Sequence, residues 1–285
     1  MKKPYFSVLM SVYDKEDARN LDVALSSIKN QTLPPNELIL VKDGPLNRDL
    51  ESIINKHSRT SPFKFKTLSL DENVGLWKAL NFGLHACSYD WIARMDSDDI
   101  SDPERFEKQF SFLAQKQDID ILGGYICEFI RKPNEKCLIR KVPLDDQEIK
   151  KVGKVRNPFN HVTVVFRKSF VERVGCYESF PGFEDYQLWI KLIMAGAKTA
   201  NMEEILVFVR IGDEEMLSRR RGMAYVKNEL LFFKWMYKVK YIGLPRYCYN
   251  VLLRTAARVL PMSLQKLIYK MLRESQKGER YNECK

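Results

Sequence analysis

The residues best suited to chemistry in this chain are three carboxylates that follow an apolar run. The run covers residues 91–95, and Asp96, Ser97, Asp98 and Asp99 follow it directly. A short apolar run predicts a buried strand, and open α/β sheets bind ligands where such strands end. Carboxylates this close repel one another, so the cluster predicts a divalent cation with oxygen ligands. The alternative is a solvated acidic loop that caps the next helix.

Polar side chains also follow two earlier apolar runs. Tyr13 comes after residues 6–12, and Asp43 comes after residues 37–41. The carboxyl ends of parallel strands meet at one edge of a sheet, so these side chains should lie near the acidic cluster. An aromatic ring can stack on a base, and a carboxylate can accept hydrogen bonds from a base or a ribose. Together they predict a nucleotide site without a P-loop or a GxGxxG motif.

The elements that must position these residues alternate between strand and helix. Apolar runs predict strands at 6–12, 37–41, 63–68 and 91–95, with helices around 21–28, 50–54 and 75–87 between them. This order predicts a mostly parallel sheet. Further along, we expect strands at 119–122, 125–130, 162–166 and 206–209, a helix at 184–195, and helical structure from 224 onward.

Composition describes a globular protein with one large or two modest domains. The chain has 285 residues, of which 45% are hydrophobic and 29% charged. No apolar run reaches the roughly 18–20 residues that span a bilayer, and the start has no signal-peptide apolar region. We therefore expect a cytoplasmic protein. Six scattered cysteines without CxxC spacing predict reduced thiols rather than a zinc site.

Five short motifs follow one another between residues 5 and 221: Ser11-Val12-Tyr13; Lys42-Asp43-Gly44; Asn73-Val74-Gly75 with Ala79-Leu80-Asn81; Asp96-Ser97-Asp98-Asp99; and Glu184-Asp185 with Leu188-Trp189. This ordered set resembles glycosyltransferase family 2. The resemblance implies a GT-A fold, with a mostly parallel central sheet flanked by helices. It also implies a UDP-sugar donor, Mn²⁺ or Mg²⁺ on its diphosphate, and inversion at the anomeric carbon.

The resemblance also implies which residues bind the donor. The nucleotide-sugar contacts would be Tyr13, Asp43, Asn73, Lys78, Arg94, Asp96, Ser97 and Asp98. Tyr13 and Asp43 would hold the uracil. Asp98 would be the leading metal ligand together with Asp96, with Asp99 left open as an alternative to Asp98. Arg94 would touch the nucleotide or form a structural ion pair.

On the acceptor side, Asp185 is the predicted catalytic base. Inverting transfer needs a carboxylate beside the acceptor hydroxyl, although an acidic residue there can also simply cap a helix. Glu184, Trp189 and His161 are predicted acceptor contacts, with a structural role as the alternative for His161. The resemblance implies that Arg219, Arg220 and Arg221 close over the diphosphate, and arginine suits phosphate by forked hydrogen bonding. A basic turn facing a membrane is the alternative for these arginines.

The positive charge of the chain is concentrated near its end. Residues 216–285 carry 16 Lys and Arg against 4 Asp and Glu, whereas the first 215 residues carry 31 against 33. Residues 264–277 place apolar and basic side chains on different helical faces. We therefore divide the chain into a GT-A domain (1–222) and a basic amphipathic extension (223–285) that binds an anionic membrane surface. Packing of the extension on the domain is the alternative.

Aromatic side chains in this extension are predicted to sit at the headgroup level: Phe232, Phe233, Trp235, Tyr237 and Tyr241.

The function predicted from these features is transfer of a hexose, glucose or galactose, from a UDP-sugar. The acceptor would be a lipid-linked saccharide, GlcNAc- or GalNAc-diphosphate-undecaprenol, in O-antigen, capsule or exopolysaccharide synthesis. An α-linked donor would give a β-linkage. The enzyme would lie on the inner face of the cell membrane and bind no nucleic acid. The alternatives are a sugar nucleotidyltransferase, which should carry an early Gly-rich phosphate loop, and a non-catalytic protein that binds nucleic acid through its basic tail.

Overall fold

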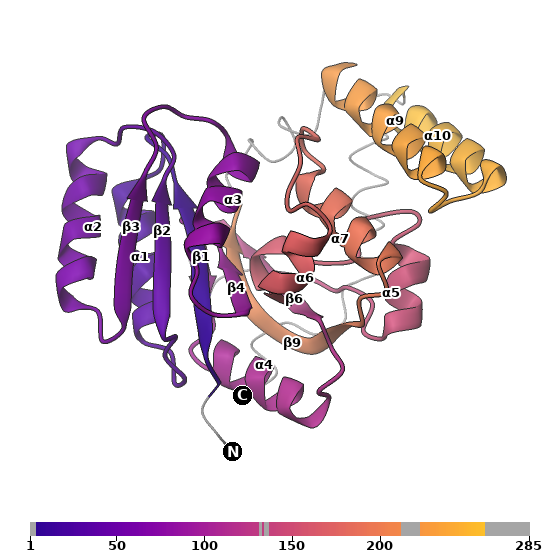
Figure 1. Ribbon diagram of the computed structural model, residues 1–285. Coiled ribbons are helices and arrows are strands. Elements are labelled where there is room, and N and C mark those ends of the chain that lie inside the picture. Colours follow the sequence, from indigo (N-terminus) through magenta and orange to yellow (C-terminus); the bar gives the residue numbers. More distant parts are fainter. Residues whose placement is uncertain (1–3, 131–132, 134–136, 212–222, 260–285) are drawn as a thin grey trace.

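The computed structural model describes residues 4–130, 133, 137–211 and 223–259 (Figure 1). Its first half is the predicted alternation of strands and helices. The elements are β1 (Phe6–Val12), α1 (Ala18–Lys29), β2 (Glu37–Lys42), α2 (Arg48–Thr60), β3 (Lys64–Ser69), α3 (Leu76–Ala86) and β4 (Trp91–Met95). β1 pairs in parallel with both β2 and β4, and β2 pairs in parallel with β3. The prediction for this half is confirmed.

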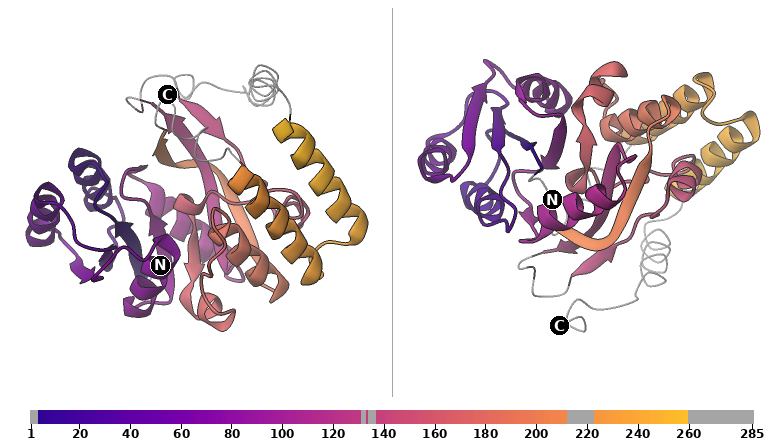
Figure 2. Two further views of the ribbon diagram at one scale, coloured as in Figure 1. Left: turned by 90° about the horizontal axis from the view of Figure 1, so that it is seen from above. Right: turned by 60° about the horizontal axis from the view of Figure 1, so that its bottom comes forward.

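The second half extends the same sheet with mixed pairing. Its elements are β5 (Ile100–Ser101), α4 (Arg105–Gln115), β6 (Ile121–Phe129), β7 (Leu138–Arg140), α5 (Asp146–Val152), η1 (His161–Thr163), β8 (Val165–Arg167), α6 (Lys168–Arg173), α7 (Glu184–Met194), β9 (Thr199–Arg210), α9 (Met223–Lys238) and α10 (Leu244–Val259). The strand order is β3-β2-β1-β4-β8-β6-β9-β5, with β7 on β6. β8 runs antiparallel to β4 and β6, and the long, curved β9 is parallel to β6 (Figure 2).

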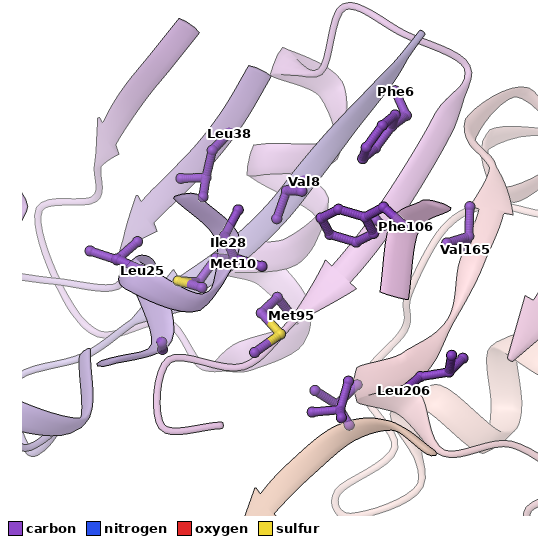
Figure 3. Close-up of a cluster of buried hydrophobic side chains, with 14 of the residues drawn as sticks. Phe6, Val8, Met10, Leu25, Ile28, Leu38, Met95, Phe106, Val165 and Leu206 are labelled. Atoms are coloured by element: carbon purple, nitrogen blue, oxygen red, sulfur yellow. The ribbon is translucent and has the colours of Figure 1, made fainter. Parts of the chain in front are cut away.

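Hydrophobic cores cover both faces of the sheet. On one face, α1, α2 and α4 pack over side chains of β1 such as Val8 and Met10 (Figure 3). On the other face, α3 and α7 pack over Leu9 and its neighbours. The strands β1, β2 and β4 are covered on both sides, so they read as nearly continuous apolar runs, which explains why their sequence pattern was clear. Each fully buried leucine contributes roughly 1.5–3 kcal/mol to stability.

Two expected strands prove to be one. β6 runs without interruption through Gly123 and Gly124, the two residues that separate the strands expected at 119–122 and 125–130. A Cβ at Gly123 would lie 2.3 Å from Oδ1 of Asn201, and a Cβ at Gly124 would lie 2.5 Å from Cδ1 of Leu206. The glycines therefore admit close packing of β9 and its side chains. The strand expected at 162–166 also differs, because its first part is the short helix η1.

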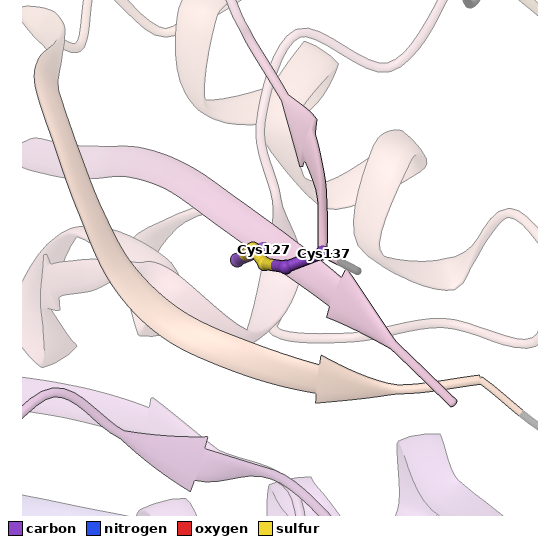
Figure 4. The surroundings of a disulfide bond; sticks show 2 residues. All are labelled: Cys127 and Cys137. Carbon is purple, nitrogen blue, oxygen red and sulfur yellow. A yellow bond between two sulfur atoms is a disulfide. The ribbon is translucent and has the colours of Figure 1, made fainter. Parts of the chain in front are cut away.

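The expectation of reduced cysteines is wrong for one pair. Cys127 in β6 and Cys137, just before β7, form a disulfide with their Cα atoms 5.6 Å apart (Figure 4). Antiparallel pairing of β7 on β6 brings these residues together. Cys87 and Cys176 are buried and free, and Cys248 is exposed and free.

The helix α9 lies against α7, and α10 packs on α9 and on the segment that follows α5, so neither helix stands apart from the domain (Figure 1). Phe232 and Phe233 are at most 1% exposed and pack with Tyr186 and Ile190 of α7. The expected headgroup position is therefore wrong for these two rings, because α7 covers the face that carries them. Among the described residues, no helix is both long enough and apolar enough to cross a bilayer. The helix expected at 264–277 lies outside the described residues.

Candidate active site

The acidic cluster begins where β4 ends, and the structure distinguishes its members. Asp99 is only 3% exposed, and its Oδ1 accepts a hydrogen bond from the backbone N–H of Arg210 at 2.9 Å. The Arg210 Nε donates to the backbone carbonyl of Asp98 at 3.3 Å, and the side chain of Asp98 is partly exposed. This geometry favours Asp98 over Asp99 as the residue that can reach a ligand.

Electrostatics in the cluster favour binding of a cation. Burial, together with the negative charges of Asp96 and Glu16, raises the pKa of Asp98. Burial and the charge of Asp98 raise the pKa of Asp99 in the same way. A bound divalent cation would relieve this repulsion. The described residues contain no group of three His, Cys, Asp or Glu that could hold a metal ion by themselves.

Arg94 lies beneath the cluster and forms the ion pair that we considered for it. Its side chain is fully buried and donates to Oδ1 of Asp96 and to the carbonyl of Met95. Arg105, also fully buried, donates to the carbonyl of Arg94 at 2.9 Å. The buried guanidinium of Arg94 therefore orients Asp96 from below. Its predicted contact with the nucleotide stays a prediction.

Glu16 is a site residue that sequence reasoning missed. Its Oε2 accepts a hydrogen bond from the Ser97 hydroxyl at 2.9 Å, and its charge acts on Asp98. Glu16 lies in the loop after β1, close in sequence to Tyr13. The sequence did show that Glu16 follows the first strand closely. Only the fold shows that this loop reaches the end of β4.

Asp43 joins two loops at the donor edge of the sheet. Its side chain accepts hydrogen bonds from the backbone N–H groups of Val74 and Gly75 at 2.8 and 3.2 Å. The Asn73 amide donates to the Asp43 carbonyl at 3.3 Å. The adjacent Gly44 has φ +93°, and a Cβ there would lie 2.8 Å from the backbone nitrogen of Asn73. Asp43 therefore fixes the loop that leads into α3, and its predicted uracil contact stays a prediction.

The other predicted donor contacts line the same edge. Tyr13, which directly follows β1, is 38% exposed, and its predicted contact with the base stays a prediction. Asn73 and Lys78 are exposed at the start of α3, and the Lys78 ammonium lies 5.4 Å from the centre of the Trp77 ring. Arg219, Arg220 and Arg221 lie outside the described residues.

On the acceptor side, the first turn of α7 presents Glu184 and Asp185. The amide of Asn157 donates to Oδ2 of Asp185 at 2.6 Å. Burial raises the pKa of Glu184, and the charge of Asp185 adds to this rise. Sequence reasoning selected Asp185 but not Asn157, because 27 residues separate the two in the chain.

His161 lies between the two acidic regions. Its Nε2 is hydrogen-bonded to the Tyr177 hydroxyl at 2.9 Å, and its ring meets the Trp189 ring edge-on. Burial and the charge of nearby Arg94 together lower the pKa of His161 to about 4, although the charges of Asp185 and Asp96 act in the opposite direction. Trp189 is fully buried behind His161, which places it as a support for that ring. The predicted contact of Trp189 with the acceptor is not seen, because neighbouring aromatic rings cover the Trp189 side chain.

The family model described as Glycosyl transferase family 2 matches residues 7–174, which is more than half of the chain. The chain therefore belongs to glycosyltransferase family 2 and is a glycosyltransferase. An Escherichia coli relative, the UDP-Gal:alpha-D-GlcNAc-diphosphoundecaprenol beta-1,3-galactosyltransferase, is 38% identical over 267 residues, covering 94% of this chain and 96% of that protein. The amylovoran biosynthesis glycosyltransferase AmsE of Erwinia amylovora is 37% identical over 264 residues, covering 93% and 97%.

Solved structures share the fold at low sequence identity. The mannosyltransferase PcManGT from Pyrobaculum calidifontis, in complex with GDP-Man and Mn²⁺, superposes with a TM-score of 0.63 at 14% identity, covering 95% of this chain and 80% of that one. Residues 1–349 of S. aureus TarS, in complex with UDP-GlcNAc, give 0.63 at 17% identity, covering 82% and 67%. The expected GT-A-like fold, a mixed and mostly parallel sheet flanked by helices, is confirmed.

Proposed function

We propose that this enzyme transfers a hexose from a UDP-sugar to a sugar hydroxyl with inversion, forming a β-linkage. The observation that carries the proposal is the separation of two kinds of acidic site around His161. The cluster at the end of β4 is crowded and suits a cation, whereas Asp185 at the start of α7 is held by an amide. A transferase needs both, one for the leaving diphosphate and one for the incoming hydroxyl.

Each proposed site residue would have a distinct role in the transfer. Asp98 and Asp96 would hold Mn²⁺ or Mg²⁺, which when bound acts as a Lewis acid on the departing diphosphate. Tyr13 would stack on the uracil, and Asn73 and Lys78 would face the diphosphate. Asp185 would take the proton of the acceptor hydroxyl from the side of the sugar opposite the leaving group.

The substrate proposal rests on the relatives. The Escherichia coli protein is named for galactose transfer from UDP-Gal to GlcNAc-diphosphoundecaprenol, and the Erwinia protein for amylovoran biosynthesis. We infer that glucose or galactose is moved to GlcNAc- or GalNAc-diphosphate-undecaprenol in O-antigen, capsule or exopolysaccharide synthesis. Such an acceptor is embedded in the membrane, which fits a membrane-associated enzyme.

A surface of α10 supports membrane association on the inner face of the cell membrane. Leu252 is 70% exposed, Leu244 55% and Tyr249 51%, and Arg246 lies over the Tyr249 ring. Exposed apolar side chains with basic neighbours suit an anionic bilayer. We expect Leu252→Gln to weaken co-sedimentation with vesicles containing anionic lipid, whereas Leu231→Gln, on an exposed position of α9, should not.

The experiment that tests the function measures UDP release by the purified chain with a panel of UDP-sugars. It is run with and without Mn²⁺ and with a GlcNAc-diphosphate-lipid analogue. Metal-dependent UDP release that rises with the acceptor is the expected result. Release of pyrophosphate from a nucleoside triphosphate would favour the alternative of a sugar nucleotidyltransferase. Strongly salt-dependent binding of nucleic acid, with no UDP release, would favour the non-catalytic alternative.

A further inference from the structure

The side-chain amide of Asn157 is fixed at both of its ends. Its Nδ2 donates to Oδ2 of Asp185 at 2.6 Å, and its Oδ1 accepts the backbone N–H of Phe159 at 3.2 Å. Rotating the amide by half a turn would place an N–H₂ group against an N–H donor and an oxygen against a carboxylate. The two bonds therefore determine which way the amide points.

The segment that carries Asn157 is held from two sides. From β9, the Asn201 amide donates to the Pro158 carbonyl at 3.1 Å. From α10, Asn250 donates to the Lys154 carbonyl at 2.8 Å and Arg254 donates to the Val155 carbonyl at 3.1 Å. The helix α10 thus supports the backbone that presents the amide to Asp185.

We propose that Asn157 is a positioning residue that fixes which oxygen of Asp185 receives the acceptor proton. The inference rests on the proposed function. Because Oδ2 is engaged by the amide, Oδ1 is left to face the acceptor hydroxyl. The hydroxyl proton moves to Oδ1, the acceptor oxygen bonds to the anomeric carbon, and the bond from that carbon to the diphosphate oxygen breaks to release UDP.

Other groups act on Asp185 but do not replace this bond. Glu184 and Tyr186 flank it on α7, and the rings of His161 and Tyr177 interact with its charge from elements packed against the helix. None of these four contacts is the 2.6 Å hydrogen bond that engages one carboxylate oxygen.

The substitution that isolates the bond is Asn157→Asp. An aspartate keeps the shape and the acceptor for the Phe159 N–H, but it replaces the donor that faces Asp185 with an oxygen. We expect kcat to fall at least tenfold near neutral pH with the KM for the donor little changed. The acid limb of the kcat/KM profile should move to higher pH, by about one unit, because two facing carboxylates share a proton. Asn157→Ala should move it in the same direction by less.

The matched control is Asn36→Asp. Oδ1 of Asn36 likewise accepts a backbone N–H, that of Phe6 at 3.0 Å, at the opposite end of the parallel strands. The same change of chemistry there should leave kcat and the pH profile unchanged. Thermal unfolding of each variant shows whether the fold is retained.

A second readout does not depend on activity. In protein carrying ¹³C-labelled aspartate carboxyls, the Asp185 resonance, assigned by Asp185→Asn, should titrate at higher pH in Asn157→Asp and Asn157→Ala than in the natural chain. An unchanged midpoint in both variants would overturn the proposal, whatever the activity. A shifted midpoint in a protein that releases no UDP would support the positioning bond and reject the proposed function instead.

Discussion

The two acidic regions of this enzyme have opposite environments. At the end of β4, Asp96, Asp98 and Asp99 crowd together, and burial with mutual repulsion raises the pKa of the latter two. At the start of α7, the carboxylate of Asp185 is bonded to a neutral amide. The first environment disfavours negative charge until a cation arrives, whereas the second offers the carboxylate a hydrogen-bond donor that engages one of its two oxygens. In the proposed function, the same residue type would bind a metal in one place and take a proton in the other.

The regions also differ in how the chain builds them. The β4 cluster comes from consecutive residues at the end of a buried strand. The acceptor side gathers Asn157, His161, Tyr177 and Asp185 from separate elements. Local sequence is therefore informative about the donor site and much less informative about the acceptor site.

The largest expected effect is from Asp185→Asn. Loss of the base should lower kcat by about 10³-fold, within the range for general base catalysis, which corresponds to about 4 kcal/mol. The affinity for UDP in the presence of Mn²⁺, measured by calorimetry, should be retained. Asp145→Asn is the control, since Asp145 accepts from the Glu148 N–H at the start of α5 and asparagine caps a helix equally well. Equal losses of kcat in both variants would mean that Asp185 is only a cap.

The next effect concerns the metal. In the presence of Mn²⁺, UDP at 100 times the Kd of UDP should stabilise the natural chain by about 2.7 kcal/mol. Asp98→Asn should remove most of this stabilisation. The raised pKa of Asp98 means that its protonated form stabilises the fold at low pH and that this contribution is lost as the pH rises. The stabilisation by Mn²⁺ should accordingly be larger at pH 8 than at pH 5.5.

Asp99→Asn provides the comparison for the metal experiment. Asp99 is bonded to Arg210, so this variant should retain much of the Mn²⁺ effect in a thermal unfolding assay. If Asp99→Asn lost the effect and Asp98→Asn kept it, the assignment of the two residues would be reversed.

A smaller effect is expected from Gly44→Ala. Its φ of +93° and the 2.8 Å approach of the Asn73 nitrogen leave no room for a Cβ. We expect a loss of about 1–3 kcal/mol in the free energy of unfolding and a higher KM for the donor, because the loop of Asn73 must move. Gly196→Ala is the control: Gly196 has φ +91° with no atom near its added Cβ. A KM that rises equally in both variants would exclude a local effect on the donor loop.

The smallest effect concerns His161. Its pKa is lowered to about 4 in the fold, so the unfolded chain binds a proton more readily between that value and about 6.5, and stability falls as the pH drops through this window. In the natural chain the free energy of unfolding should therefore fall between pH 7 and pH 5. In His161→Asn this fall should be smaller by about 1 kcal/mol, measured by urea denaturation. His85→Asn, with 64% of the His85 side chain exposed, should not reduce it.

Much of the fold was predictable because its first half obeys a simple pattern. Strands buried on both faces are apolar throughout, and the helices between them show apolar spacing. The pattern failed at Gly123-Gly124, where two expected strands are one strand and the glycines allow close packing. It also failed for Phe232 and Phe233, since an apolar helical face packs equally well on a membrane or on α7.

The sequence by itself determined the parallel half of the sheet, the family, and the carboxylates at the strand ends, because those features depend on neighbours in the chain. Only the tertiary structure decided that Asp98 rather than Asp99 faces outward, that Arg94 pairs with Asp96, and that Asn157 engages Asp185. The reason is physical: burial and hydrogen-bond geometry depend on residues far apart in sequence. Side-chain chemistry can be read from the chain, but its environment is set by packing.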